Sequence, residues 1–196
     1  MRTMNKIYVY MKEAAVRVLG PGVRYVLWVQ GCHKRCPGCI ASNSHDMKEG
    51  TPIHGGALAL EIALSDAQGL TISGGEPFLQ ADALADMIDE IHKIRPMGVI
   101  VYTGYTYEEL LQNPSAERLL KRIDLLIDGE YIEEKNSGKG LYGSSNQRAI
   151  ALTSLYEKEA TVYAEMPRET EIFRHGREFH EVGIPKNKKK EGEQAR

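Results

Sequence analysis

The sequence has very little cysteine: three residues among 196, all between positions 32 and 39. An odd number of closely spaced thiols is not a disulfide framework, and in a reducing compartment such thiols bind metal more often than they pair. The chain also lacks an apolar run long enough to cross a bilayer or to serve as a secretory signal. We therefore expect a cytoplasmic protein that makes no membrane contact.

The chain also lacks a strong charge of either sign. Acidic and basic residues nearly balance, with a formal net charge of -2, so the strongly basic surface typical of nucleic-acid binding is not expected. A hydrophobic fraction of 42% fits a folded globular chain. The length suits one domain with a small appendage.

Short apolar runs alternate with stretches of helical spacing over the first 150 residues. The strands are expected at residues 23–30, 69–73, 99–103 and 123–127, and the helices at 57–67, 79–95, 107–112 and 115–121. This alternation predicts an α/β fold with a parallel sheet and a site at the carboxyl ends of the strands. A complete eight-stranded βα barrel needs about 250 residues, so residues 1–150 are expected to form an incomplete, open barrel.

The pattern changes from residue 151 onward. Residues 161–166 and 171–184 read as strands, with His175-Gly176 as a hairpin turn. We expect residues 151–185 to form a small β-rich appendage, followed by a charged, disordered tail at 186–196.

The three cysteines lie on one short loop with the sequence CHKRCPGC and are Cys32, Cys36 and Cys39. On a four-iron cubane, three thiolates leave one iron with an open coordination position, because the chain has no fourth cysteine. A structural zinc site closes with four ligands, for which His33, His45 or His54 is available. Usual zinc spacings pair cysteines as CxxC, so the pattern favours a [4Fe-4S] cluster over zinc.

A second loop of interest follows the strand at 69–73 and contains Gly74, Gly75, Glu76 and Pro77. Two glycines let the backbone approach a ligand closely, and a nearby carboxylate favours an ammonium group. Taken alone, this segment is ordinary turn material.

Together, CxxxCxxC after one strand and GGEP after the next resemble the signature of the radical S-adenosylmethionine (SAM) superfamily. The resemblance implies a partial barrel of the radical SAM type, a [4Fe-4S] cluster on the three cysteines, and SAM bound at the open iron. It also implies reductive cleavage of SAM to a 5'-deoxyadenosyl radical. The GGEP segment, residues 74–77, would then hold the methionyl amino group.

A narrower resemblance covers residues 16–150, which are similar to the activating proteins of anaerobic ribonucleoside-triphosphate reductase, a group of glycyl radical enzyme activases. It rests on five ordered segments: GPGVR at 20–24, CPGC at 36–39, YTGY at 102–105, DLLIDG at 124–129 and GSSNQR at 143–148. The resemblance implies SAM contacts at Thr103, Asn146 and Gln147. It also implies a glycyl radical enzyme as partner, such as anaerobic ribonucleotide reductase, and a reduced flavodoxin or ferredoxin-type electron donor.

Plainer interpretations stay open for the individual residues. Thr103 lies in a segment that is also ordinary turn material, and Asn146 and Gln147 are also suited to satisfying a loop backbone. The basic residues at 33–35 read as an exposed edge rather than as groups that tune a cluster. The alternative functions are a radical SAM enzyme that modifies a peptide or small molecule, and a non-catalytic metal-binding module.

Overall fold

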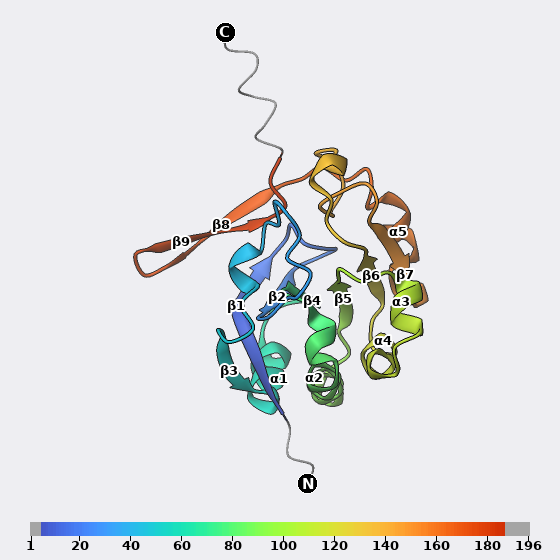
Figure 1. Ribbon diagram of the computed structural model, residues 1–196. Helices are drawn as coiled ribbons and strands as arrows, with labels where there is room; N and C mark the ends of the chain where they lie inside the picture. Colours follow the sequence, from blue (N-terminus) through green and yellow to red (C-terminus); the bar gives the residue numbers. More distant parts are fainter. Residues whose placement is uncertain (1–4, 187–196) are drawn as a thin grey trace.

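The computed structural model describes residues 5–186. Its centre is a seven-stranded mixed sheet with the strand order β3-β1-β2-β4-β5-β6-β7 (Figure 1). The strands are β1 Lys6–Val16, β2 Arg24–Val29, β3 Thr51–His54, β4 Gly69–Gly74, β5 Gly98–Tyr102, β6 Leu125–Asp128 and β7 Arg148–Ala151. A separate hairpin consists of β8 Thr170–His175 and β9 Glu178–Gly183.

Four neighbouring strands of the sheet, β2, β4, β5 and β6, are parallel. Their carboxyl ends therefore meet at one edge, where the loops that follow them lie side by side. Strand β7 runs antiparallel to β6, so the 143–147 segment that precedes β7 reaches the same edge. The structure is mixed α/β, and within residues 5–186 the edge strands β3 and β7 do not pair with each other. The partial barrel of the radical SAM type stays a prediction.

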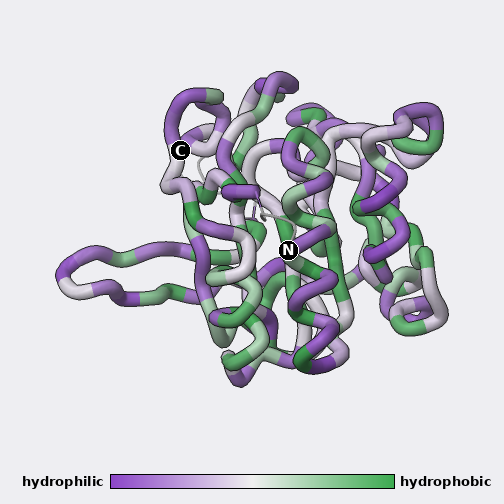
Figure 2. Tube along the Cα trace, turned by 90° about the horizontal axis from the view of Figure 1, so that it is seen from below, coloured by the Kyte–Doolittle hydropathy of each residue, from purple (hydrophilic) through white to green (hydrophobic). Residues whose placement is uncertain are grey.

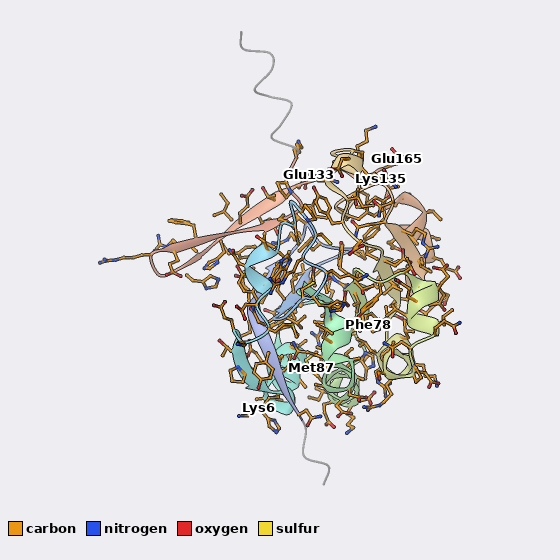
Figure 3. All side chains as sticks on the ribbon, in the orientation of Figure 1. Lys6, Phe78, Met87, Glu133, Lys135 and Glu165 are labelled. Carbon is orange, nitrogen blue, oxygen red and sulfur yellow. The ribbon has the colours of Figure 1, made fainter. Side chains whose placement is uncertain are left out.

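Helices cover one face of the sheet. They are α1 Gly55–Leu64, α2 Ala81–Ile94, α3 Tyr107–Leu111 and α4 Glu117–Leu120. The α2 helix forms here because its apolar residues recur at helical spacing and are buried against the sheet: Leu84, Met87, Ile88 and Ile91. Met87 and Phe78, labelled in Figure 3, belong to this main core. Short 3-10 turns occur at Ser42–Ser44, Pro77–Gln80, Pro114–Ala116, Glu133–Lys135 and Ser154–Tyr156.

The C-terminal part of the chain covers the opposite face. Helix α5 Glu157–Val162 and the turns around it bring Tyr156 and Tyr163 into a cluster with buried residues of β5 and β6. The base of the hairpin places Val182 in a cluster with Val26 and Trp28 of β2. The far end of the hairpin projects from the body as an arm (Figure 2).

The strands and helices predicted between residues 23 and 127 are confirmed, as is the hairpin with its turn at residues 175–176. Three strands, β1, β3 and β7, were not predicted. In β1, Ile7 and Val9 alternate with exposed residues, but two register irregularities and a positive φ of 63° at Ala15 interrupt the pattern.

The strand predicted at residues 161–166 is wrong, because α5 extends to Val162 and a turn follows. Local β preference suggested a strand there, whereas Tyr156, Ala160 and Tyr163 lie at helical spacing and pack on the sheet together. Burial of that stripe outweighs the local preference. Of the predicted tail, residues 187–196 lie outside the described residues. No helix within residues 5–186 is long and apolar enough to span a bilayer.

Candidate functional site

The cysteine loop begins where β2 ends and lies at the carboxyl edge of the parallel strands. Its start is fixed by two backbone hydrogen bonds, from the Gly31 amide to the Ser44 carbonyl at 2.8 Å and from the Cys32 amide to the His45 carbonyl at 3.1 Å. The Cys39 amide donates to the Cys36 carbonyl at 3.2 Å, which closes the second half of the loop into a tight turn. The first thiol is thereby buried, while the other two stay partly exposed.

The three thiols share one electrostatic environment. Burial raises the pKa of Cys36 and that of Cys39. Cys32 adds to both increases, and Cys36 adds to the increase at Cys39. Backbone amides act in the opposite direction: that of Tyr131 lowers the pKa of Cys36, and that of Ala41 lowers the pKa of Cys39. Amide hydrogen bonds to sulfur are one of the ways in which proteins adjust iron-sulfur clusters.

Two of the histidines that could complete a zinc site have other contacts. Within residues 5–186, no group of three or more His, Cys, Asp and Glu side chains is placed to hold a single metal ion. His33 Nε2 lies 3.1 Å from the Tyr105 hydroxyl, and His54 caps α1 by accepting from the Gly56 amide at 3.2 Å.

The glycines of the GGEP segment let two loops cross at close range. A Cβ on Gly75 would lie 2.2 Å from the Gly31 carbonyl oxygen, and the Glu76 amide donates to that oxygen at 2.8 Å. At Gly74, φ is +97° and a Cβ would lie 2.6 Å from backbone atoms of Val29. The close approach at both glycines is therefore to the backbone that leads into Cys32.

Glu76 is buried and ties the β4 loop to the β5 loop. One carboxylate oxygen accepts from the Phe78 amide at 3.0 Å and from the Thr103 hydroxyl at 2.8 Å, and the other accepts from the Gly104 amide at 2.8 Å. Burial raises the pKa of Glu76, while these hydrogen bonds and the Lys34 ammonium offset part of the increase. Thr103 and the glutamate thus contact each other, and Pro77 begins the turn that follows.

Lys34 is not part of an exposed edge, as the sequence had suggested. Its side chain is 18% exposed, and its ammonium lies 4.8 Å from the centre of the Tyr105 ring and 3.9 Å from the Glu130 carboxylate. His33 and Arg35 are exposed, as predicted. Lys34 therefore joins the cysteine loop to the loops after β5 and β6, a role that its position between two cysteines does not reveal.

Asn146 and Gln147 fasten their own loop to the loop after β6. The Gln147 amide group accepts from the backbone amides of Gly143 and Ser144 at 2.8 and 3.1 Å and donates to the Gly129 carbonyl at 2.8 Å. Asn146 Nδ2 donates to the Glu130 carbonyl at 2.8 Å, and its buried Oδ1 has no hydrogen-bond partner among the described residues. That Oδ1 is an acceptor suited to a ligand donor.

The arginines of two recognised segments have structural positions. Arg148 pairs with Asp128 and Glu108, which joins β7 to β6 and α3. Arg24, the last residue of the GPGVR segment, is fully buried at the amino ends of the parallel strands. The cysteine loop lies at the other end, so Arg24 stabilises the sheet from the far side of the site.

Comparison with known proteins matches the part of the chain that carries these loops. The 4Fe-4S single cluster domain model matches residues 18–150. The anaerobic ribonucleoside-triphosphate reductase-activating protein of Enterobacteria phage T4 is 32% identical over 137 residues, which is 67% of this chain and 85% of that protein. That of Escherichia coli is 32% identical over 141 residues, which is 66% of this chain and 89% of that protein. That of Haemophilus influenzae is 32% identical over 154 residues, which is 74% of this chain and 96% of that protein.

Proposed function

The chain belongs to the 4Fe-4S single cluster domain family and to the family of anaerobic ribonucleoside-triphosphate reductase-activating proteins, and from this premise we propose that it is a radical SAM activating enzyme. Its target is a glycyl radical enzyme, most simply an anaerobic ribonucleotide reductase. The observation that carries the proposal is the convergence of the cysteine loop with the loops after β4, β5 and β6 at one edge of the sheet.

The cysteine loop fits a [4Fe-4S] cluster. The thiols of Cys36 and Cys39 have raised pKa values to which a neighbouring thiol contributes, and the loop is partly exposed. Cys32, Cys36 and Cys39 would hold the cluster and leave one iron for a second ligand. When bound, the cluster supplies the electron that cleaves SAM to the 5'-deoxyadenosyl radical.

The carboxylates around the cysteine loop suit a cationic ligand such as SAM. Glu76, Glu109 and Glu130 come from three different elements, and Lys34 lies among them and interacts with each. A sulfonium with an ammonium group is favoured near such carboxylates. Gly74 to Pro77 would line the ligand's amino end, Thr103 would fix Glu76, and Asn146 Oδ1 would accept a donor from the ligand.

The remaining task of the protein is to orient SAM and to keep the radical from reacting elsewhere. The hydrogen bonds of Glu76 hold the loops after β4 and β5 together, so this part of the site is already ordered before a ligand binds. The segment that follows the cysteine loop presents two exposed apolar side chains, Ile40 at 65% and Met47 at 59% exposure. Exposed apolar side chains in the segment after the cysteines suit a macromolecular partner whose glycyl loop would complete the site and exclude water from it. A reduced flavodoxin or ferredoxin-type protein is the proposed electron donor.

The experiment starts with anaerobic reconstitution of the chain. We expect one [4Fe-4S] cluster per chain, a change in its electron paramagnetic resonance spectrum on adding SAM, and SAM cleavage under reducing conditions. With the reductase from the same organism, a glycyl radical doublet should follow. Replacing any one of the three cysteines with alanine should abolish both the cluster and the doublet.

Two results would contradict the proposal, one for the cluster and one for the partner enzyme. Stoichiometric zinc without iron uptake would exclude the cluster and leave a non-catalytic metal module. Competent SAM cleavage without the doublet, together with hydrogen transfer from a peptide or a metabolite, would replace the partner enzyme with that substrate.

A further inference from the structure

Tyr105 lies in the loop after β5, and its backbone ties that loop to two of its neighbours. Its carbonyl accepts a hydrogen bond from the Gly129 amide, in the loop after β6, at 2.8 Å. Its amide donates to the Thr103 hydroxyl at 3.1 Å, and that hydroxyl donates to the Glu76 carboxylate, in the loop after β4, at 2.8 Å. The side chain of Tyr105 therefore extends from a backbone that is fixed on both sides.

This side chain reaches the cysteine loop, which follows β2. Its ring is partly buried and packs against the main core. The Tyr105 hydroxyl lies 3.1 Å from His33 Nε2, and the two ring centres are 5.6 Å apart. The Lys34 ammonium lies 4.8 Å from the centre of the same tyrosine ring, within the range of a cation–π interaction. One side chain thus contacts two consecutive residues of the cysteine loop.

The chain between the first and third cysteines has little to fix it by itself. Within residues 5–186, the backbone amides of residues 33–38 donate no backbone hydrogen bond, whereas those of Cys32 and Cys39 on either side do. Arg35 has a φ of 49°, a left-handed conformation that costs free energy in a residue other than glycine. Such a stretch keeps one position only if contacts from outside hold it. Tyr105 supplies two of these contacts.

A second contact of Lys34 acts in the same direction. Its ammonium lies 3.9 Å from the carboxylate of Glu130, which follows β6, next to the glycine that donates to the Tyr105 carbonyl. A cation that is shared between an aromatic ring and a carboxylate has less freedom than one with a single partner. Lys34 and Tyr105 therefore join the cysteine loop to loops that are already fastened to each other.

We propose that Tyr105 is the positioning residue of the cysteine loop. Through His33 and Lys34 it holds that loop in place, and through its backbone it is tied to the loops after β4 and β6. This inference rests on the proposed function, because the placement matters only if the cysteines carry a cluster that meets SAM beside Glu76. It goes beyond that function by assigning the spacing of the two binding loops to a side chain that acts through its neighbours.

The test compares Tyr105→Leu and Tyr105→Phe with the matched control Tyr107→Leu. Leucine removes both contacts to the cysteine loop, whereas phenylalanine keeps the ring beside Lys34 and loses only the hydroxyl. Tyr107 is also partly buried and packed against the main core. Within residues 5–186 it makes no hydrogen bond or ring contact with the cysteine loop.

The first measurement is residue-resolved amide hydrogen exchange in the full, cluster-free chain. The reporters are the amides of Gly31 and Cys32, whose backbone hydrogen bonds break when the loop opens. In Tyr105→Leu they should exchange about tenfold faster, the combined effect of losing an exposed cation–π contact and one hydrogen bond. Tyr105→Phe should exchange about threefold faster, since it loses the hydrogen bond alone. Tyr107→Leu should leave both amides near the wild-type rate.

The second measurement is the electron paramagnetic resonance spectrum of the reduced, reconstituted protein with and without SAM. At unchanged iron content, Tyr105→Leu should lose part of the SAM-induced change, because the cysteine loop and the Glu76 loop are no longer held at one spacing. Tyr105→Phe should retain most of it. If Tyr105→Leu does not fold, Tyr105→Phe combined with Lys34→Met, which removes the same two contacts and keeps the ring, decides the question by the same criteria.

Three outcomes would overturn the inference. They are wild-type exchange in Tyr105→Leu, an equal acceleration in Tyr107→Leu, and faster exchange in Tyr105→Leu with an unchanged SAM-induced spectrum. Failure of the proposed function is distinguishable from all three. It would appear as a wild-type chain that takes up no cluster, or whose spectrum does not respond to SAM, whatever the exchange data show.

Discussion

Glu76 and Gly75 are adjacent residues with different structural tasks. The carboxylate of Glu76 joins two loops through hydrogen bonds, whereas Gly75 allows one loop to cross another without a side chain between them. Sequence alone indicates that this segment is special but not which task belongs to which residue. Each task leads to a separate prediction.

Thr103→Val should destabilise the protein by about 1–3 kcal/mol, because the variant removes a donor from a buried carboxylate. The same hydroxyl accepts from the Tyr105 amide at 3.1 Å, so the loop after β5 also loses an anchor. Urea unfolding of the cluster-free chain measures the change. Thr103→Ser keeps the hydroxyl and should stay near the wild type, and Thr161→Val at an exposed position should change stability by less than about 0.5 kcal/mol. Equal loss in the serine and valine variants would show that the hydroxyl is not the cause.

Gly75→Ala should lower iron uptake on reconstitution as well as stability. The new methyl group would collide with the Gly31 carbonyl, and relief requires moving the backbone immediately before Cys32. Iron per chain measures the effect. Gly104→Ala is the matched control, because its nearest neighbour is the flexible Lys34 side chain at 3.3 Å. Full iron content in Gly75→Ala would contradict this account of the crossing.

The sequence reveals the cysteine site better than its surroundings. Three thiols within eight positions are visible as a ligand set without any tertiary information. Lys34 is different, because its importance comes from contacts with loops that are distant in the chain. A basic residue between cysteines carries no local pattern that predicts those contacts.

At the scale of elements, prediction succeeded where one kind of periodicity ran without interruption. Strands β2, β4, β5 and β6 are mostly buried and read as short apolar runs, as parallel strands usually do. Edge strands β3 and β7 have no fully buried residue and give no such signal. Local composition is a weak guide at a sheet edge, because one side of each edge strand lacks a partner.

Ion pairs join α2 to α4 and to Arg122, which follows α4, and the pair of Arg122 gives a pH-dependent prediction. Arg122 donates to both carboxylate oxygens of Asp89, at 2.7 and 2.6 Å. This hydrogen bonding lowers the pKa of Asp89. A carboxyl group whose pKa is lowered by folding stabilises the protein above its ordinary pKa, and the contribution is lost as pH falls through the lowered value.

Asp89→Asn should therefore reduce stability at neutral pH by about 0.2–1 kcal/mol, the range for a solvent-accessible ion pair. The difference from the wild type should shrink below about pH 4, where the ordinary carboxyl group begins to take up protons. Urea unfolding at a series of pH values measures it. Asp66→Asn, at an exposed aspartate without an ion pair in the described structure, should show no such trend. A difference that is constant with pH would show that the pair is not its source.

At the scale of the whole molecule, buried contacts join the C-terminal segment to the sheet. Arg24 Nη1 donates to the Tyr156 hydroxyl at 2.7 Å, and the same guanidinium bonds Thr71 and the Gly98 carbonyl. One buried cation thus joins three parallel strands to the segment that leads into α5. The predicted division at residue 150 follows a change in sequence pattern, whereas the buried contacts cross it.

The last prediction tests whether the two parts unfold together. Tyr156→Phe leaves a buried guanidinium donor without its acceptor and should cost about 1.5–3 kcal/mol, while Tyr10→Phe, at a residue 39% exposed, should cost little. Trp28, the only tryptophan, is 8% exposed and lies in the cluster with Val182 of the hairpin, so its fluorescence reports where the C-terminal segment meets the sheet.

Fluorescence and far-ultraviolet circular dichroism should give coincident urea transitions in the wild type, and Tyr156→Phe should shift both midpoints together. Coupled loss is expected because Arg24 and Tyr156 lie on opposite sides of the predicted boundary and share one buried hydrogen bond. A fluorescence transition that precedes the dichroism transition would mean that the C-terminal segment opens first. The segment would then be a separate unit, and the buried bond between Arg24 and Tyr156 would be lost before the sheet unfolds.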